Sequence, residues 1–168
     1  MKPEDKRLFE ELLVYREDIF YICLGFTKNP CDAEELTQDV FLKAFEKIET
    51  LRNTQLAKMW LLKICRNTCL DYAKKIRIRN LLWKPKGSYS TKSNTPESQI
   101  ILKQQIKSVK ESIQRLPKKL REVFILREYG DLSYRELAVT LGVKEGTVMS
   151  RLNRARRGIM DMVKGELE

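Results

Sequence analysis

Residues 133–157 are the part of this sequence that most restricts how the chain can fold. Apolar residues recur at helical spacing before and after Gly142, which predicts two helices joined by a tight turn at this glycine. On the second helix one face is mostly apolar and is expected to pack inward: Thr147, Val148, Leu152, Ala155 and Ile159. The opposite face contains no acid and is expected to stay in solvent: Met149, Ser150, Asn153, Arg154 and Arg157. A helix-turn-helix with such a face is typical of DNA binding.

The rest of the chain is also predicted to be helical, and we expect an all-α fold of two small helical domains. Helices are expected near residues 4–26, 32–51 and 58–79, with further helices from Pro96 onward. Residues 80–95 contain three Lys, three Ser, a Pro and a Gly but no acid, which predicts a flexible linker. The linker spans at most about 55 Å, so domains at 1–79 and 96–168 could act more than one turn of DNA apart.

Several residues signal where these helices begin and end. Gly25, together with the Asn-Pro pair that follows it, is expected to end the first helix. Asp32 is expected to cap the second helix. Ser133 and Glu136 have the spacing of a capping box, which places the start of the first helix of the helix-turn-helix.

Charge changes sign along the chain. Residues 1–50 carry 7 Lys and Arg against 12 Asp and Glu, residues 51–92 carry 11 against 1, and residues 93–168 carry 15 against 10. This distribution favours a polyanionic partner that contacts the second and third blocks. On charge alone, a solvated cationic surface without a partner is an equal alternative.

Two helical faces in the first domain are candidate binding surfaces. On the expected helix at 32–51, acidic and polar residues surround Leu42 as in a protein-docking patch, although a single exposed leucine is usually unremarkable. On the expected helix at 58–79, cations alternate with apolar residues and an amide, which suits a nucleic-acid strand, with an ordinary basic helix as the other interpretation. The outer members of this basic face are Met59, Lys63, Arg66, Asn67, Leu70, Lys74 and Arg77.

Composition argues against several other classes of protein. Four cysteines and no histidine fit a reducing compartment, where we expect structural, buried thiols, with a zinc or redox role as the alternative. We therefore expect no cofactor and no metal site. No apolar run approaches the roughly 20 residues of a membrane span, and the N-terminus lacks a signal-peptide core, which predicts a cytoplasmic protein. The lack of histidine and of a carboxylate cluster disfavours a nucleic-acid enzyme.

Taken together, the two halves resemble a bacterial RNA polymerase sigma factor of the sigma-70 family, in its extracytoplasmic function (ECF) group. The run DAEELTQDVFLKAFEKIETLRNTQLAKMWLLKICRNTCLDYAKK resembles region 2 of that family. The run LPKKLREVFILREYGDLSYRELAVTLGVKEGTVMSRLNRARRGI resembles region 4. The resemblance implies a protein without catalytic activity that binds core RNA polymerase, recognises −35 and −10 promoter elements and promotes DNA opening.

The resemblance also implies partners and residue roles. The partners are the β′ clamp helices and β flap of polymerase, promoter DNA and an anti-sigma factor, often membrane-anchored; the free chain would be a monomer. The recognition helix would enter the −35 major groove with Met149, Ser150, Asn153, Arg154 and Arg157. The opened −10 strand would contact Arg52, Asn53, Thr54, Trp60, Lys63, Ile64, Arg66, Asn67, Lys74 and Arg77. Core polymerase would contact Asp32, Glu35, Gln38, Asp39 and Leu42.

Three positions depart from the family pattern. Met149 stands where Lys or Arg is common, Lys144 where a Ser often caps the recognition helix, and Ala57 where an aromatic residue is common. These departures bear on the −35 preference, the helix cap and the base pocket. The competing hypothesis is a free-standing, dimeric helix-turn-helix regulator that binds an operator without polymerase. It leaves the acidic face around Leu42 without a role.

Overall fold

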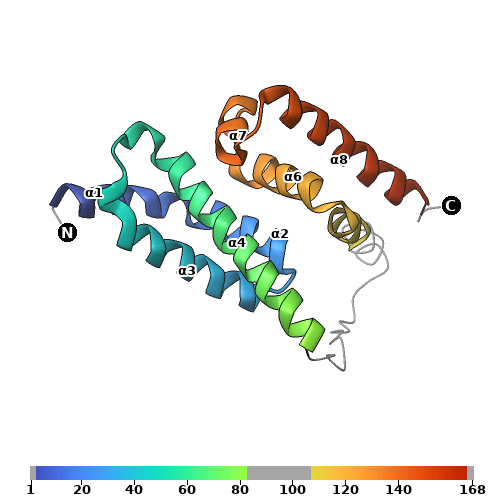
Figure 1. Cartoon of the computed structure of the whole chain (residues 1–168), viewed down its shortest axis with the longest axis horizontal. Coiled ribbons are helices and arrows are strands. Elements are labelled where there is room, and N and C mark those ends of the chain that lie inside the picture. The colour runs from blue at the N-terminus through green and yellow to red at the C-terminus, as the bar shows by residue number, and fades with distance from the viewer. Residues whose placement is uncertain (1–2, 83–106, 166–168) are drawn as a thin grey trace, which may run out of the picture.

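The computed structural model describes residues 3–82 and 107–165, and every regular element in these two ranges is helical (Figure 1). The first range contains four α-helices: α1 (Pro3–Leu12), α2 (Arg16–Thr27), α3 (Pro30–Lys47) and α4 (Ala57–Leu82). Short 3₁₀ turns connect them at Leu13–Tyr15, Ile48–Thr50 and Thr54–Leu56. The second range contains a helical segment at 107–115, then α6 (Lys118–Gly130), α7 (Tyr134–Leu141) and α8 (Glu145–Gly165). The predicted all-α fold is therefore confirmed.

The predicted linker at 80–95 lies mostly outside the described residues. Helix α4 continues to Leu82, so the first three residues of that prediction are helical. Residues 83–95, and the helix start expected at Pro96, fall in the range that the structure does not describe.

The helix expected near residues 4–26 is interrupted by the 3₁₀ turn at Leu13–Tyr15 and forms α1 and α2. Two helix ends also differ from the prediction. Helix α2 continues through Gly25 and ends at Thr27, and the following Lys28 adopts a left-handed conformation with φ of 64°. Helix α3 is capped by Asn29, whose side chain accepts a hydrogen bond from the Cys31 amide at 2.9 Å. Asp32, the predicted cap, lies inside the first turn and is already helical. The Asn-Pro pair places a capping amide and a residue with fixed φ in the order that starts a helix, so the start moves upstream.

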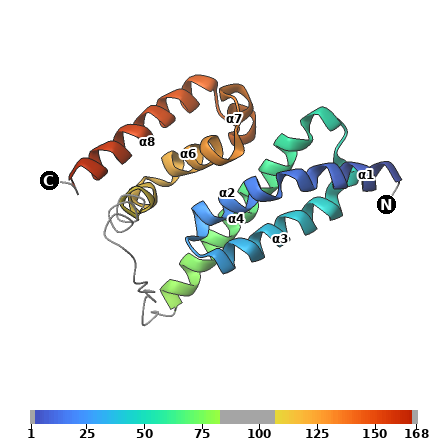
Figure 2. The same ribbon diagram turned by 180° about the vertical axis from the view of Figure 1, so that it is seen from behind.

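Helices α2 and α4 are the centre of the molecule, because both halves pack against them. A continuous buried cluster runs from Ile19, Ile22 and Leu62 in the first half to Ile125, Leu126 and Leu132 in the second. The backbone at Gly130 lies against Ile22 and Leu62. Figures 1 and 2 show α6 and α7 lying alongside α2 and α4 in opposite views. The two expected domains therefore share one apolar core in this structure.

The backbone of α2 packs closely against α6 at Gly25. A Cβ placed on this glycine would lie 2.9 Å from Cδ1 of Ile125 in α6 and 3.1 Å from both of its Cγ atoms. The Gly25 carbonyl also accepts a hydrogen bond from Nε2 of Gln114 at 2.8 Å. Nearby, the rings of Tyr21 and Tyr129 stack with centroids 5.8 Å apart. The residue expected to end a helix therefore serves close packing instead.

Candidate nucleic-acid interface

The helix-turn-helix forms as the sequence predicts. The Glu136 amide donates to Oγ of Ser133 at 3.2 Å, and the Ser133 amide donates to the Glu136 carboxylate at 2.8 Å, which completes the capping box of α7. These hydrogen bonds hold the pKa of Glu136 below its usual range. Gly142 ends α7 in the left-handed conformation with φ of 66°. The turn that orients α8 is thus fixed by residues of its own sequence.

Helix α8 starts without a serine cap. The carbonyl of Lys144 accepts hydrogen bonds from the amides of Thr147 at 2.9 Å and Val148 at 3.2 Å. The backbone therefore begins the helix at this position, and the Lys144 side chain is exposed beside the helix start. A cation is electrostatically unfavourable at a helix N-terminus but would suit a nearby phosphate.

The two faces of α8 separate as the periodicity predicts. Val148, Leu152, Ala155 and Ile159 are buried. The five residues predicted to read the −35 element are all exposed: Met149, Ser150, Asn153, Arg154 and Arg157. Met149 is an apolar side chain on this face with 51% of its surface exposed. The arginines project from a rigid helix, which is the arrangement that major-groove readout needs.

Arg154 is positioned along the helix surface by its own backbone. Its Nε donates to the Ser150 carbonyl at 3.3 Å, and the Ser150 hydroxyl donates to the Thr147 carbonyl at 3.1 Å. Both contacts are exposed, and within residues 3–82 and 107–165 the terminal guanidinium nitrogens of Arg154 have no hydrogen-bond partner. These nitrogens are the ones that a guanine edge would use.

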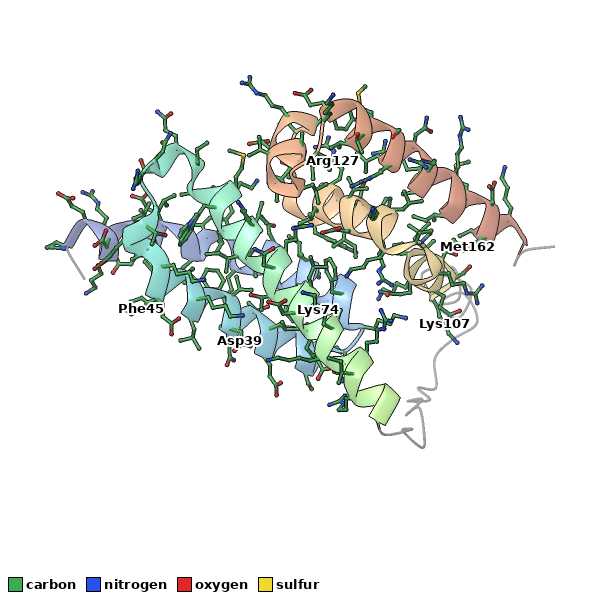
Figure 3. All side chains as sticks on the ribbon, in the orientation of Figure 1. Asp39, Phe45, Lys74, Lys107, Arg127 and Met162 are labelled. Atoms are coloured by element: carbon green, nitrogen blue, oxygen red, sulfur yellow. The ribbon has the colours of Figure 1, made fainter. Side chains whose placement is uncertain are left out.

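The basic face of α4 lies on the opposite half of the molecule. Lys63, Asn67, Lys74 and Arg77 are exposed, whereas Trp60 and Ile64 are half-buried. Lys74 lies midway along α4 in Figure 3 and pairs with Asp71 at 3.2 Å, an exposed contact that contributes little stability. The exposed faces of α4 and α8 thus supply the two cationic surfaces that the charge distribution predicts.

The loop before α4 contains the remaining predicted −10 residues. Arg52, Asn53 and Thr54 are exposed. The Asn53 side chain accepts a hydrogen bond from the Gln55 amide at 3.0 Å and so caps the 3₁₀ turn at Thr54–Leu56. Ala57 starts α4 and is buried, so a small residue fits the position where the family often has an aromatic one. Asn53 therefore has a structural contact in addition to its predicted role.

Arg66 differs from the other predicted −10 residues because it is engaged in an ion pair between the two halves. Its guanidinium forms an ion pair with Glu122 of α6, and the two side chains are only 22% and 7% exposed. Arg66 can follow a phosphate, as predicted, only after this pair breaks. Sequence reasoning missed Glu122, although its helical spacing from the apolar Ile125 and Leu126 indicates a buried acid.

The acidic face of α3 is exposed as predicted, with one exception. Glu35, Gln38, Asp39 and Leu42 are exposed, and Leu42 has 61% of its surface in solvent. Asp39 lies on this face in Figure 3. Asp32 is the exception, because it is half-buried and accepts a 2.6 Å hydrogen bond from the Tyr72 hydroxyl of α4. Burial and this hydrogen bond raise the pKa of Tyr72 to about 12.

Comparison with known proteins follows the same division into two regions. Residues 13–78 match the Sigma-70 region 2 family, and residues 106–158 match the Sigma-70, region 4 family. No helix among the described residues has the length and apolar character to span a membrane.

Relatives of known function match over most of the chain. The ECF RNA polymerase sigma-E factor of Escherichia coli K12 is 30% identical over 172 residues, which cover 95% of this chain and 88% of that protein. RNA polymerase sigma factor SigV of Bacillus subtilis is 29% identical, covering 84% of this chain and 81% of that protein. The sigma factor RpoE of Bartonella quintana, solved with the anti-sigma factor NepR, has the same fold with a TM-score of 0.69 and 23% identity, covering 92% of this chain and 95% of that one. This chain therefore belongs to the extracytoplasmic function group of the sigma-70 family of RNA polymerase sigma factors, and it carries regions 2 and 4.

Proposed function

We propose that this protein is an alternative sigma factor that binds core RNA polymerase, recognises the −35 and −10 elements of a promoter, and promotes DNA opening. The observation that carries the proposal is the pair of exposed cationic faces, on α8 in region 4 and on α4 in region 2. Promoter opening requires one surface that recognises duplex DNA and a second surface that binds the separated strand, and the two cationic faces can serve these two purposes.

Region 4 reads duplex DNA in this proposal. The exposed face of α8 enters the major groove at the −35 element, where Ser150, Asn153 and Arg154 contact base edges and Arg157 contacts the backbone. The Met149 side chain has no strong hydrogen-bonding group, so it contributes to base preference by apolar contact, for example with a thymine methyl group.

Region 2 stabilises the opened strand. Lys63, Asn67 and the loop at residues 52–54 hold an unstacked base, and Lys74 and Arg77 neutralise adjacent phosphates. No hydrolysis is needed, because binding energy for the unpaired strand offsets the lost stacking of the duplex. The protein therefore acts by binding and not as an enzyme.

The acidic face of α3 is the proposed contact with core polymerase. Leu42 provides an exposed apolar anchor, and Glu35, Gln38 and Asp39 provide a polar rim around it. We assign this face to the β′ clamp helices, and region 4 to the β flap. A free-standing regulator would have no use for such a face.

The structures of similar sigma factors support the partners and the location that we propose. Bartonella quintana RpoE was solved with an anti-sigma factor, and CnrH was solved with the cytosolic domain of CnrY. This supports an anti-sigma partner for the present chain, which could be anchored in the membrane. The sigma factor itself would be cytoplasmic, monomeric when free, and associated with the nucleoid through polymerase.

The compact arrangement of the two regions fits the free form of the protein. The partly buried Arg66–Glu122 pair and the contact at Gly25 hold region 4 against region 2. Binding of the two promoter elements at once requires these contacts to open, which also frees Arg66 for the strand. Polymerase would supply the binding energy that separates the regions.

Run-off transcription tests the proposal. Purified core polymerase is incubated with genomic fragments, with and without this chain, and we expect discrete transcripts only when the chain is present. Electrophoretic mobility assays with the isolated chain provide the comparison. Tight operator binding by the isolated chain, without chain-dependent transcripts, would favour the free-standing regulator and contradict the proposal.

A further inference from the structure

Three cysteines that lie far apart in the sequence meet in the core of region 2. Cys23 comes from α2, and Cys65 and Cys69 come from successive turns of α4. Sγ of Cys23 lies 3.9 Å from Sγ of Cys65 and 3.8 Å from Sγ of Cys69, and the three sulfur atoms all lie within 4.8 Å of one another. All three are free thiols with 0% of their surface exposed.

The spacing of the sulfur atoms fits a metal ion held by three thiolates. At a metal–sulfur distance of about 2.3 Å, trigonal coordination places sulfur atoms about 4.0 Å apart and tetrahedral coordination about 3.8 Å apart. Two of the three pairs already have these separations. The sulfur atoms of Cys65 and Cys69 would need to move only slightly toward each other to complete a trigonal set of three sulfur ligands.

Among the residues that the structure describes, no fourth cysteine, histidine or carboxylate joins this group. The buried Thr37 hydroxyl donates to the Ala33 carbonyl at 2.7 Å, and the Thr68 hydroxyl accepts from Lys43 at 3.1 Å. The chain contains no histidine. A donor set of three sulfurs selects a soft ion that accepts low coordination, which among physiological ions is Cu(I), whereas Zn²⁺ usually has four ligands.

We propose that Cys23, Cys65 and Cys69 form a trigonal thiolate site for Cu(I) inside region 2. Binding forms three sulfur–copper bonds and releases the three thiol protons to solvent, and no electron is transferred. The ammonium group of Lys43, held at Thr68 next to Cys69, partly balances the negative charge of the complex. The bound ion links α2 to α4, the helix that bears the basic face.

The site is closed in this structure, so loading depends on motion. Because the three thiols have no exposed surface, an ion reaches them only when α2 and α4 separate transiently. Once bound, the ion opposes that separation and stabilises region 2. The inference stands independently of the proposed promoter contacts.

The test is a competition titration of the reduced, full-length protein with Cu(I) under anaerobic conditions, against a colorimetric Cu(I) chelator. We expect one tightly bound Cu(I) per chain. Cys23→Ser and Cys69→Ser should each weaken binding by at least about 100-fold, since each removes a ligand. The matched control is Cys31→Ser, which changes an exposed cysteine outside the cluster and should leave the affinity unchanged.

X-ray absorption of the wild-type copper complex provides a test that does not depend on how the variants fold. Three sulfur ligands at about 2.3 Å are expected. Two sulfur ligands, or nitrogen and oxygen ligands, would overturn the proposal. Loss of binding in Cys31→Ser, or unchanged binding in folded Cys23→Ser and Cys69→Ser, would overturn it as well.

Discussion

The contact between Gly25 and Ile125 gives a sharp test of whether regions 2 and 4 dock in solution. In Gly25→Ala, the added methyl group would meet three carbons of Ile125 at 2.9 to 3.1 Å. Ile125 is fully buried and β-branched, so its side chain has little freedom to move away from the added methyl group. Overpacking of this kind costs about 1–3 kcal/mol, which would shift the docking equilibrium toward the open form by about 5- to 150-fold.

The same substitution should stabilise region 2 itself. Gly25 lies inside α2, where alanine is favoured over glycine by about 1 kcal/mol. Because the clash with Ile125 favours the open form, the variant should have a larger radius of gyration by small-angle scattering and faster hydrogen exchange on the side of α6 that faces α2. Even in the open form of the variant, the amides of α2 should be protected from hydrogen exchange as well as they are in the wild type.

Two further variants separate the clash from the helix effect. Gly146→Ala in α8 adds a methyl group that meets nothing within 4 Å, so it should leave the radius of gyration unchanged. Ile125→Ala removes all three opposing carbons, so Gly25→Ala should be neutral or favourable in that background. A Gly25→Ala protein that is as compact as the wild type, and simply more stable, would refute the docking argument.

Four other predictions concern single side chains. Arg154→Ala should weaken promoter binding by about 1–3 kcal/mol and relax the −35 preference, measured by run-off transcription on −35 variants; an unchanged preference would remove Arg154 from base readout. Asn67→Ala should bind core polymerase normally but impair open-complex formation in permanganate footprinting, and normal opening would exclude it from strand capture. Ser133→Ala should cost about 1 kcal/mol in urea denaturation at neutral pH. Because Ser133 lowers the pKa of Glu136, part of the stabilisation is present above the ordinary pKa of a glutamate and lost as pH falls through the lowered one. The difference between the two proteins should therefore shrink in acid, and the part due to the hydrogen bond from the Glu136 amide to the Ser133 hydroxyl should remain. The pKa of Tyr72 is raised to about 12, so the stability that its phenol contributes is present below the ordinary tyrosine pKa and is lost as pH rises through about 12. Tyr72→Phe removes the phenol, so the variant should lack that alkaline loss.

The sequence predicted the elements whose cause is local. The capping box at Ser133 and Glu136, the left-handed turn at Gly142 and the outward face of α8 all depend on residues within a few positions of each other. Such features follow from hydrogen-bond geometry and helical periodicity, which short-range sequence contains. One error was local as well: Asn29 competed successfully with Asp32 for the cap of α3.

The sequence by itself determined an all-α chain with two cationic faces, one acidic face and a helix-turn-helix. Only the tertiary structure decided that Arg66 pairs with Glu122, that Ile125 packs against Gly25, and that Cys23 lies next to the two cysteines of α4. Each of these contacts joins residues more than 40 positions apart, and helical periodicity records only that a side chain is buried, not which partner it meets. The partners are fixed by how the helices pack into a common core.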